Sequence, residues 1–350
     1  MKDRTFDIAV VGAGAAGLCA ALAFARDGFR TALVGTPDAR RDGRTVALLN
    51  GSVRFLEALG AWPSIQAQAA PLATMRLIDD TGSLFRPPPV AFRAAEIGLD
   101  AFGWNIENAD LVESLAASVA AQARITPLPS SSTGFEVENG LAVIALADGT
   151  RISAALAVAA DGRNSALRQA AGIAARSWTY PQSALTTILA HDREHLEAST
   201  EFHTRRGPFT LVPLRDRRSS LVWVTSPAEA ERLKALSDEA LALAVERQAQ
   251  SILGRMRVDG PRGLVPMSGL SVDRFQATRL ALVGEAAHVF PPIGAQGLNL
   301  GLRDVAALRD AVVDGRTDPG SDTVLQAYQR GRDLDVRLRT AAVDGLNRTL

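Results

Sequence analysis

Cysteine and lysine are scarce in this 350-residue sequence, and neither sign of charge predominates. Cys19 is the only cysteine, which excludes an internal disulfide and a CxxC redox pair. Lys2 and Lys234 are the only lysines, so nearly all basic side chains are arginines. The 38 basic and 38 acidic side chains cancel, so no overall field would attract nucleic acid, and no such partner is expected.

Long apolar runs and targeting signals are also missing. No run reaches the roughly 18 apolar residues of a membrane-spanning helix, and the N-terminal "MKDRTFDIAVVGAG" leads straight into a strand without a cleavable signal. His191, His195 and His203 lack metal-ligand spacing, so we expect surface histidines and no metal site. With 47% hydrophobic and 22% charged residues, the sequence predicts a cytoplasmic globular protein that has two domains, or one large domain with an insertion.

What the sequence does contain is a glycine-rich turn between a predicted strand, residues 6–11, and a predicted helix. In "GAGAAG", Gly12 allows the turn, Gly14 lets a pyrophosphate approach the backbone, and Gly17 lets the helix and strand pack closely. The N-terminus of the helix then presents N–H groups to phosphate. This order predicts a dinucleotide site, whereas Cys19 inside the helix is expected to be a small core side chain.

The next strand departs from the usual dinucleotide pattern. It should end in an acidic residue that binds the adenosine ribose, but Gly35 stands there. Asp38 and the "DGRT" turn at residues 42–45 are the candidate substitutes. Arg44 in that turn either faces phosphate or belongs to a solvated turn, and the sequence leaves both interpretations open.

Two further predicted strands are followed by acidic residues. An apolar strand at residues 156–159 precedes Asp161 and Gly162, after which polar residues open a helix. A later strand, residues 279–285, ends at Glu285 before a segment rich in proline and glycine. We find no second GxGxxG fingerprint after a strand, so a separate nicotinamide-binding domain is not expected.

Together, these three signals resemble the flavin-dependent aromatic hydroxylase family, whose best-known member is para-hydroxybenzoate hydroxylase. In that family a glycine fingerprint, an Asp-Gly motif and a Gly-Asp motif bind one FAD, and they correspond here to Gly12–Gly17, Asp161–Gly162 and Gly284–Glu285. The third motif departs from the family by carrying glutamate. The resemblance implies an α/β fold in which a Rossmann-like FAD-binding domain of the GR2 type carries an inserted antiparallel-sheet substrate domain.

The segment "GEAAHVFPPIGAQGLNLGLRD", residues 284–304, contains no side chain that looks like a nucleophile. The resemblance implies that reduced flavin activates oxygen, while backbone N–H groups of this segment support charge at the flavin N1 and O2 edge. His288 and Pro292 are weak catalytic candidates, with a structural, hydrogen-bonded His288 as the stronger interpretation. Gly301→Ala is expected to have a milder effect than Gly297→Val, because alanine suits a helix interior. The residues expected to lie along the flavin are Gly294, Gln296, Gly297, Leu298 and Asn299.

The middle of the chain resembles, more narrowly, the bacterial hydroxylases of ubiquinone biosynthesis. Residues 199–224 read as strands alternating around two turns, which predicts an antiparallel sheet. Members of this branch usually continue some tens of residues further, so a shortened C-terminal side is a further expectation. The residues that match the branch are Phe202, Gly207, Pro208, Pro213, Leu214, 221–223, "PMSGL" at 266–270 and "RTVALLNGSVRFLEALGAW" at 44–62. The turns also carry arginines, which form either a solvated surface or a contact with anionic lipid: Arg205, Arg206, Arg215, Arg217 and Arg218.

The predicted FAD-binding domain is discontinuous and comprises residues 1–70, 100–178 and 271–350. The predicted substrate domain comprises residues 71–99 and 179–270.

The resemblance implies a monooxygenase that hydroxylates the aromatic ring of a polyprenylated ubiquinone precursor, a polyprenyl phenol or quinone, through a flavin C4a-hydroperoxide. FAD, O2 and a reductant, NAD(P)H or another electron donor, are then required. Peripheral contact with the inner membrane face and contacts with a quinone-biosynthesis complex are further expectations. Two alternatives stay open: a prenyl-chain flavin reductase of the same fold, and a non-catalytic FAD-binding subunit of a quinone-biosynthesis complex.

Overall fold

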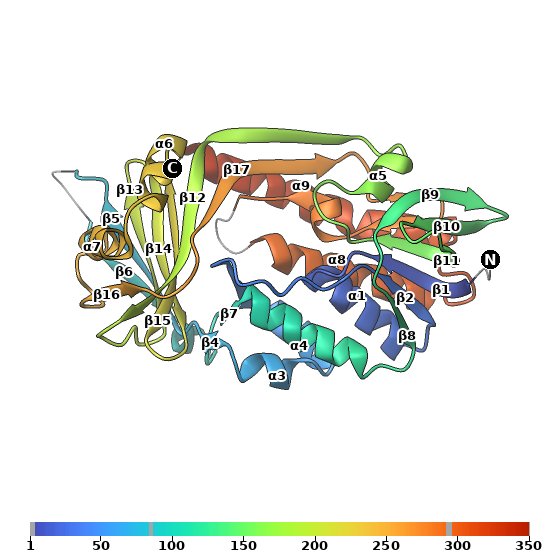
Figure 1. Ribbon diagram of the computed structural model, residues 1–350, viewed down its shortest axis with the longest axis horizontal. Helices are drawn as coiled ribbons and strands as arrows, with labels where there is room; N and C mark the ends of the chain where they lie inside the picture. The colour runs from blue at the N-terminus through green and yellow to red at the C-terminus, as the bar shows by residue number, and fades with distance from the viewer. Residues whose placement is uncertain (1–3, 84–86, 292–295, 350) are drawn as a thin grey trace.

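The computed structural model describes residues 4–83, 87–291 and 296–349. Figure 1 shows an elongated molecule, with a helix-covered sheet of mainly parallel strands at one end and a large antiparallel sheet at the other. Two long strands, β12 (Ala175–His191) and β17 (Gly263–Val272), pair with each other and run between the two parts. Of the helices in the described ranges, none has a stretch long and apolar enough to cross a membrane.

The parallel sheet contains the strands predicted to precede the three motifs. β1 (Arg4–Val11) lies between β11 (Arg151–Ala159) and β2 (Thr31–Val34) and runs parallel to both. β19 (Leu280–Leu282) pairs in parallel with β11, so the carboxyl ends of these strands lie at one edge of the sheet. The remaining strands of this sheet are β8 (Ile125–Leu128), β9 (Ser132–Glu138), β10 (Leu141–Leu146) and β18 (Gln276–Ala277).

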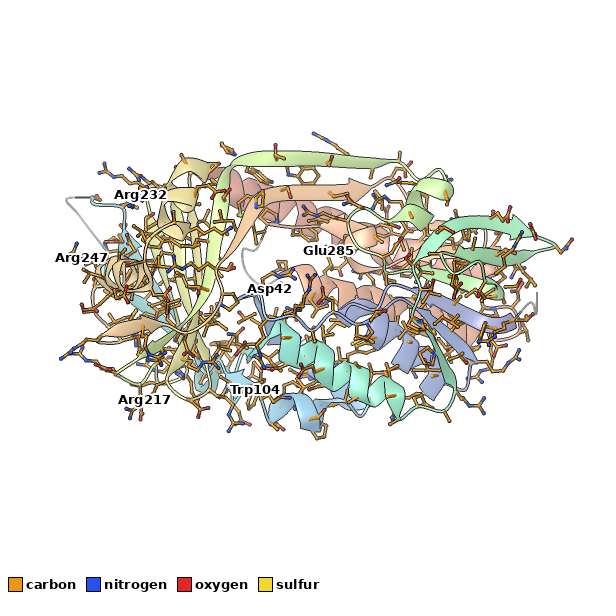
Figure 2. All side chains as sticks on the ribbon, in the orientation of Figure 1. Asp42, Trp104, Arg217, Arg232, Arg247 and Glu285 are labelled. Atoms are coloured by element: carbon orange, nitrogen blue, oxygen red, sulfur yellow. The ribbon has the colours of Figure 1, made fainter. Side chains whose placement is uncertain are left out.

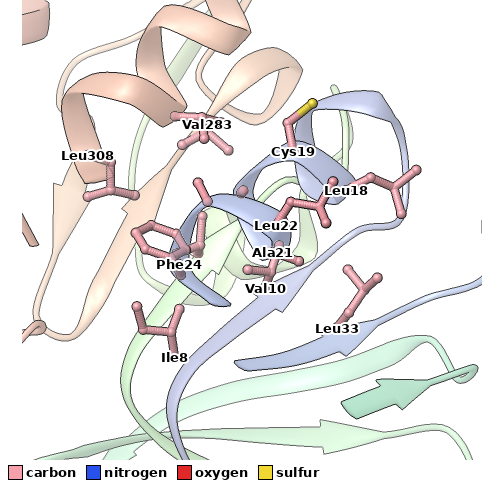
Figure 3. Close-up of a cluster of buried hydrophobic side chains, with 14 of the residues drawn as sticks. Ile8, Val10, Leu18, Cys19, Ala21, Leu22, Phe24, Leu33, Val283 and Leu308 are labelled. Carbon is pink, nitrogen blue, oxygen red and sulfur yellow. The ribbon is translucent and has the colours of Figure 1, made fainter. Parts of the chain in front are cut away.

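Small side chains allow helix α1 (Ala15–Arg26) to pack closely on this sheet. Ala20, Ala21 and Ala23 are fully buried or nearly so, and a short side chain lets a helix approach a strand. Figure 3 shows α1 in the same apolar cluster as Val10, with Cys19 among its side chains. Burial raises the pKa of the Cys19 thiol, and its predicted role as a core side chain is confirmed.

The antiparallel sheet is covered on one face by helices. Leu241 and Val245 of α7 (Asp238–Gln248) pack with Phe202 and Phe209, which neighbouring strands of the sheet carry. The strands of this sheet are, in order, β20 (His288–Val289), β17, β12, β15 (Arg218–Thr225), β14 (Gly207–Leu214), β13 (Ala198–Thr204), β5 (Thr74–Asp80) and β6 (Val90–Arg93), with β16 (Met256–Val258) beside β12. The predicted antiparallel strands of residues 199–224 are therefore confirmed.

A small third sheet and the other helices complete the described chain. The third sheet pairs β3 (Thr45–Leu49), β7 (Gly103–Glu107) and β4 (Ala70–Pro71). The other helices are α2 (Asn50–Ala58), α3 (Trp62–Gln66), α4 (Asn108–Ala120), α5 (Ala166–Ala170), α6 (Pro227–Lys234), α8 (Gln296–Asp314) and α9 (Asp322–Thr349), with 3-10 turns η1 (Ala94–Ile97) and η2 (Gly284–Ala286).

This architecture confirms the predicted α/β fold with an inserted antiparallel sheet. β5 and β6, from the predicted insertion at 71–99, pair with each other and join the antiparallel sheet at β13. The residue limits of the two domains stay a prediction, because β12 and β17 run through both parts.

One histidine prediction is wrong. His191 was expected at the surface, but it is only 7% exposed at the end of β12. Its Nδ1 lies 2.7 Å from the Arg193 carbonyl oxygen and its Nε2 lies 3.0 Å from Ser219 Oγ. The strand pairing carries the ring inward, a tertiary effect that the polar surrounding sequence hides.

Candidate functional site

The three predicted motifs meet at the carboxyl edge of the parallel sheet. Gly12 follows β1, Asp161 follows β11 by two residues, and Gly284 follows β19 by two. A Cβ placed on Gly12 would lie 2.1 Å from the Ala160 carbonyl oxygen, and one on Gly284 would lie 3.3 Å from Ala16 Cβ. Segments more than 100 residues apart in the chain therefore share one small region, because β1, β11 and β19, which precede the three motifs, pair side by side.

The glycines of the first motif meet different surroundings. Gly12 has a φ of +113°, which side chains rarely adopt. A Cβ on Gly17 would lie 1.9 Å from the Gly12 carbonyl oxygen, so Gly17 is required for close packing. A Cβ on Gly14 would have no described heavy atom within 4 Å, apart from its chain neighbours. The open space beside Gly14 is the cradle that a pyrophosphate needs, and these residues fit a dinucleotide such as FAD.

The N-terminus of α1 differs from those of the surface helices. Ser226 and Ser237 cap α6 and α7 by accepting hydrogen bonds from backbone N–H groups. Gly14 occupies the N-cap position of α1, and no side chain in the described part of the chain caps this helix. The N–H groups of the first turn therefore face the open space, where phosphate oxygens would satisfy them.

Asp161 of the second motif has one occupied and one unoccupied oxygen. Its Oδ2 accepts hydrogen bonds from the backbone N–H groups of Ala166 (2.9 Å) and Leu167 (3.3 Å) at the start of α5. Its Oδ1 is buried and has no hydrogen-bond partner within the described ranges. A buried acceptor without a donor suits a ligand hydroxyl, and Gly162 beside it has a φ of +80° and open space at its Cβ position.

The third motif corrects one sequence expectation. The strand predicted over residues 279–285 ends at Leu282, and Glu285 lies in the 3-10 turn η2, with its side chain exposed beside buried neighbours. Arg44 binds Asp42, with 2.6 Å between Arg44 Nη2 and Asp42 Oδ2. This bond raises the pKa of Arg44, and the charge of Glu285 raises it further. Arg44 and Glu285 therefore lie close enough for their charges to interact. Figure 2 labels Glu285 and Asp42, the ion-pair partner of Arg44.

The ribose substitute suggested for Gly35 has other contacts. Asp38 pairs with Arg40 across 2.7 Å at the surface, and these hydrogen bonds lower the pKa of Asp38 to about 2. Gly35 has a φ of +122° and its Cβ position lies 3.2 Å from the Ala13 backbone nitrogen. A side chain here would crowd the glycine turn.

The predicted flavin-facing residues form the first turn of α8, which begins at Gln296. Within the described ranges, a Cβ on Gly297 would meet no heavy atom within 4 Å apart from its own helix and chain neighbours, and a helix cannot bond the N–H groups of its own first turn. Gly301 is different: its Cβ position lies 3.1 Å from Gly284 Cα, so an alanine here would press on the turn of the third motif, and its milder effect relative to Gly297→Val stays a prediction. Pro292 and Gly294 lie outside the described residues.

Sequence reasoning missed the side chain of Asn299, for which only its backbone was considered. Its Oδ1 accepts hydrogen bonds from the Leu49 backbone N–H (2.9 Å) and Ser52 Oγ (2.6 Å), and its Nδ2 donates to the Ala47 carbonyl (2.7 Å). Asn299 is 6% exposed, and it ties α8 to β3 and α2. A lone amide among the apolar residues of "GLNLGL" was the available signal.

His288, the other described catalytic candidate, is enclosed by protein. Its Nε2 lies 2.6 Å from Asp304 Oδ2, and both side chains are 0% exposed. The ring is therefore turned into the fold and is not open to a substrate. Among the residues that the structure describes, no group of three or more potential metal ligands occurs.

The antiparallel sheet meets this region with its uncovered face. Thr45 Oγ1 donates a 2.9 Å hydrogen bond to Ser220 Oγ on β15. Because side chains alternate along a strand, Val222 and Val224 share the face of Ser220, away from the helix-covered face. Val224 packs with Ala184 and Met267 in a small apolar cluster. This face supplies an apolar wall on the nucleotide-binding side.

Ion pairs join the two parts at one side of the contact. Glu107, at the end of β7, binds Arg41 at 2.7 Å and Arg218 at 2.9 Å, and Arg218 also binds Asp259 at 2.8 Å. These residues line a pocket of about 390 Å³. Its charged lining is unsuited to an apolar ligand, and we interpret it as a contact that holds the sheet in place.

The arginines of the two hairpin turns do not form one surface. Arg205 and Arg206 lie in the β13–β14 turn, whereas Arg215 and Arg217 lie in the β14–β15 turn at the other end of β14. β14 has 8 residues, so the two turns are about 26 Å apart. Arg217 pairs with Glu194 at 3.1 Å. The cluster read from the sequence is therefore divided between opposite ends of the sheet.

Comparisons with known proteins agree with this geometry. The family model described as FAD binding domain matches residues 5–340. Ubiquinone hydroxylase UbiL of Rhodospirillum rubrum is 32% identical over 99% of this chain and 82% of its own length, and 3-demethoxyubiquinol 3-hydroxylase of Escherichia coli is 31% identical over 98% and 90%.

Solved structures share the fold. PqsL of P. aeruginosa, solved with 2-aminobenzoylacetate, superposes with a TM-score of 0.79 at 22% identity over 97% of this chain and 94% of that one. The tetrameric 2-methyl-3-hydroxypyridine-5-carboxylic acid oxygenase superposes with a TM-score of 0.78 at 20% identity over 100% and 93%. The chain therefore belongs to the FAD-binding family of flavoprotein monooxygenases, in the branch of aromatic hydroxylases that contains the ubiquinone-biosynthesis hydroxylases.

Proposed function

We propose that this protein hydroxylates the aromatic ring of a polyprenylated ubiquinone precursor, using FAD, O2 and NAD(P)H or another electron donor. The observation that carries the proposal is the similarity to two ubiquinone hydroxylases over almost the whole chain. The FAD-binding part alone would not distinguish substrates, but the similarity extends through the antiparallel sheet. The apolar wall of that sheet supports an aromatic substrate with a hydrocarbon tail.

Bound FAD supplies the oxygen-transfer chemistry, and the chain's own residues hold and shield it. The open space at Gly14 and the first turn of α1 would receive the pyrophosphate, while Asp161 Oδ1 and the Glu285 carboxylate would accept hydrogen bonds from hydroxyl groups. The first turn of α8, with Leu298 and Asn299, would place N–H groups beside the flavin ring. Arg44 would balance negative charge near Glu285.

The substrate wall has a separate task. Val222, which is partly exposed and has no hydrogen-bonding side chain, would hold an aromatic ring by apolar contact and keep water away from the reacting atoms, while the buried Val224 and Met267 pack behind it. Because His288 is turned into the fold, we assign it no proton-transfer step.

Peripheral membrane contact is part of the proposal, and two exposed strands support it. Met75 of β5 and Phe92 of β6 are directly opposed and 45% and 50% exposed, and Val90 is 46% exposed. A contiguous exposed apolar patch marks an interaction surface. The same exposed patch would also serve for contact with a protein of a quinone-biosynthesis complex. Flotation with liposomes, compared between the parent and Phe92→Ser, tests lipid binding: flotation that the variant loses indicates a lipid contact, and no flotation of the parent indicates a protein contact.

The test is quinone-intermediate profiling by mass spectrometry in cells that lack this protein, together with oxygen uptake by the purified enzyme. An accumulated precursor that lacks one ring hydroxyl group, restored by the wild type and not by Gly14→Val, is the expected result. Reduction of a prenyl double bond without oxygen consumption would indicate a prenyl-chain reductase. FAD binding without substrate-stimulated oxygen uptake would indicate a non-catalytic subunit.

A further inference from the structure

A fully buried carboxylate lies behind the third motif. Asp304 of α8 is 0% exposed and accepts three hydrogen bonds. Its Oδ2 lies 2.9 Å from the Gly284 backbone nitrogen and 2.6 Å from His288 Nε2, and its Oδ1 lies 2.8 Å from Arg332 Nε. None of these partners lies within 15 residues of Asp304 in the sequence.

A buried charge is costly unless donors surround it. The three donors come from three separate elements, η2, β20 and α9, so the carboxylate can be satisfied only when all three are in place. Arg332 also binds Asp335 through its Nη1 at 2.8 Å. The hydrogen bonds of Asp304 therefore form together only when η2, β20 and α9 are correctly packed around α8.

The donor from η2 is the one that matters for the cofactor. Gly284 immediately precedes Glu285 and has a φ of +60°. Its Cβ position is close to Ala16 Cβ, at 3.3 Å, and Gly301 lies against it. The position of the Glu285 carboxylate thus depends on where the Gly284 N–H is held, and Asp304 holds it.

Helix α9 enters the same arrangement. Tyr328 is 1% exposed and its hydroxyl donates a 2.6 Å hydrogen bond to the Leu282 carbonyl at the end of β19. Arg332, one turn further along α9, reaches Asp304. α9 therefore contacts both the strand before the third motif and the carboxylate behind it.

We propose that Asp304 is a positioning residue for the cofactor: it fixes the Gly284–Glu285 turn so that Glu285 faces the FAD, and it couples α9 to FAD affinity through Arg332. This inference rests on FAD binding by the family and is independent of the substrate proposed above. Asn299, five residues earlier on α8, anchors the same helix to β3 and α2. Helix α8 therefore fixes the distance between the η2 turn on one side of the site and β3 and α2 on the other.

The test begins with Asp304→Asn. An amide has one acceptor oxygen and one donor nitrogen, so whichever way it turns, either Gly284 or Arg332 loses its acceptor. We expect FAD affinity, measured by titration of the refolded apoprotein, to fall by about tenfold to a hundredfold. Asp335→Asn is the matched control, because it leaves all three Asp304 contacts in place, and its FAD affinity should stay within about threefold of the parent.

A double-mutant cycle separates positioning from general loss of structure. If Asp304 acts through Glu285, combining Asp304→Asn with Glu285→Ala should weaken FAD binding scarcely more than Glu285→Ala alone. Losses that multiply as independent effects would overturn the proposal. The near-ultraviolet and visible circular dichroism of bound flavin should also change in Asp304→Asn, which a change in global stability alone would not produce.

His288 provides a second pair of variants if Asp304→Asn does not fold. His288→Gln keeps a nitrogen donor towards Asp304 and should bind FAD as the parent does, whereas His288→Leu removes it and should bind several-fold more weakly. Equal FAD affinity of these two variants would overturn the proposal. Since FAD binding is measured without substrate, this result is independent of the quinone profile that tests the function.

Discussion

The carboxyl edge of the parallel sheet and the uncovered face of the antiparallel sheet meet near Thr45 and Ser220, but they are built from different parts of the chain. The first presents main chain: open space beside Gly14, backbone N–H groups of α1 and α8, and few side chains. The second presents side chains such as Val222, whose direction follows from strand alternation. Backbone sites recognise what all members of a family share, whereas side-chain walls can differ between substrates.

Gly14→Val is the strongest way to test the backbone side of this comparison. The valine side chain would fill the open space that the pyrophosphate needs, so FAD binding should be lost, while the apoprotein should unfold at nearly the parent temperature. Gly17→Val is the contrast, because its Cβ would collide with the Gly12 carbonyl oxygen at 1.9 Å. That variant should lose its fold as well as FAD. Thermal unfolding and flavin absorbance of both variants are the measurements. A Gly14→Val protein that keeps bound FAD would contradict the role of the open space beside Gly14 in binding the pyrophosphate.

Glu285→Ala tests the exposed carboxylate of the third motif. Losing a charge-assisted hydrogen bond should weaken FAD binding by about 1–3 kcal/mol. Glu285→Asp should retain much of the affinity, since aspartate keeps a carboxylate that can accept the same hydrogen bond. Isothermal titration of the two variants is the measurement, and an alanine variant with normal affinity would reduce Glu285 to a structural turn residue.

Val222→Ser tests the side-chain wall. The exchange replaces an apolar contact by a hydroxyl group, which should weaken the apparent free energy of substrate binding by about 1–2 kcal/mol. Substrate-dependent product formation should fall accordingly. FAD affinity should not change. Steady-state kinetics with FAD titration separates the two effects, and a variant that loses FAD instead would show that the two regions are not independent.

Gly301→Ala and Gly297→Val sharpen the comparison inside α8. Alanine at Gly301 would press on Gly284 Cα at 3.1 Å, so it should weaken FAD binding through the third motif, by about 1 kcal/mol. Valine at Gly297 meets no other part of the described chain at its Cβ and should leave the apoprotein fold intact, while it impairs flavin binding or raises peroxide release. Apoprotein melting and peroxide assays distinguish them. Efficient coupling of oxygen to product in Gly297→Val would contradict the backbone-donor role of this turn.

The smallest expected effect concerns pH and the antiparallel sheet alone. Burial is the main cause that lowers the pKa of His191, so the unfolded chain takes up a proton before the folded one does as the pH falls. The neutral ring therefore stabilises the fold above about pH 6.5, and this contribution is lost as the pH falls through the folded-state pKa. His191→Gln should flatten the pH dependence of the free energy of unfolding below about pH 6.5. FAD affinity should show no such change.

The sequence predicted the backbone region well because its geometry demands particular residues. Gly12 and Gly162 adopt a positive φ, and Gly17 lies where no side chain fits, so each leaves a visible trace. Contacts made by side chains left no such trace. Asn299 binds Leu49 across 250 residues, and Thr45 binds Ser220 across 175.

Helix propensity likewise gave no sign that the Cβ position of Gly301 lies close to Gly284, because that contact depends on packing and not on local preference. The fold class came from motif order, which depends on topology, whereas the buried network around Asp304 depends on elements that only the folded chain brings together.

The paired course of β12 and β17 has a consequence for protein engineering. One excursion of the chain away from the parallel sheet runs from Ala175, where β12 begins, to Val272, where β17 ends, and these two residues are direct partners in the strand pairing. The second excursion, which contains β5 and β6, is closed in the same way, because Thr74 at its start pairs with Arg93 at its end. Each excursion therefore starts and ends at adjacent points, so a chimaera could exchange both between two members of the family without moving the FAD-binding residues. Such a chimaera would have a new substrate preference and an unchanged FAD-binding part.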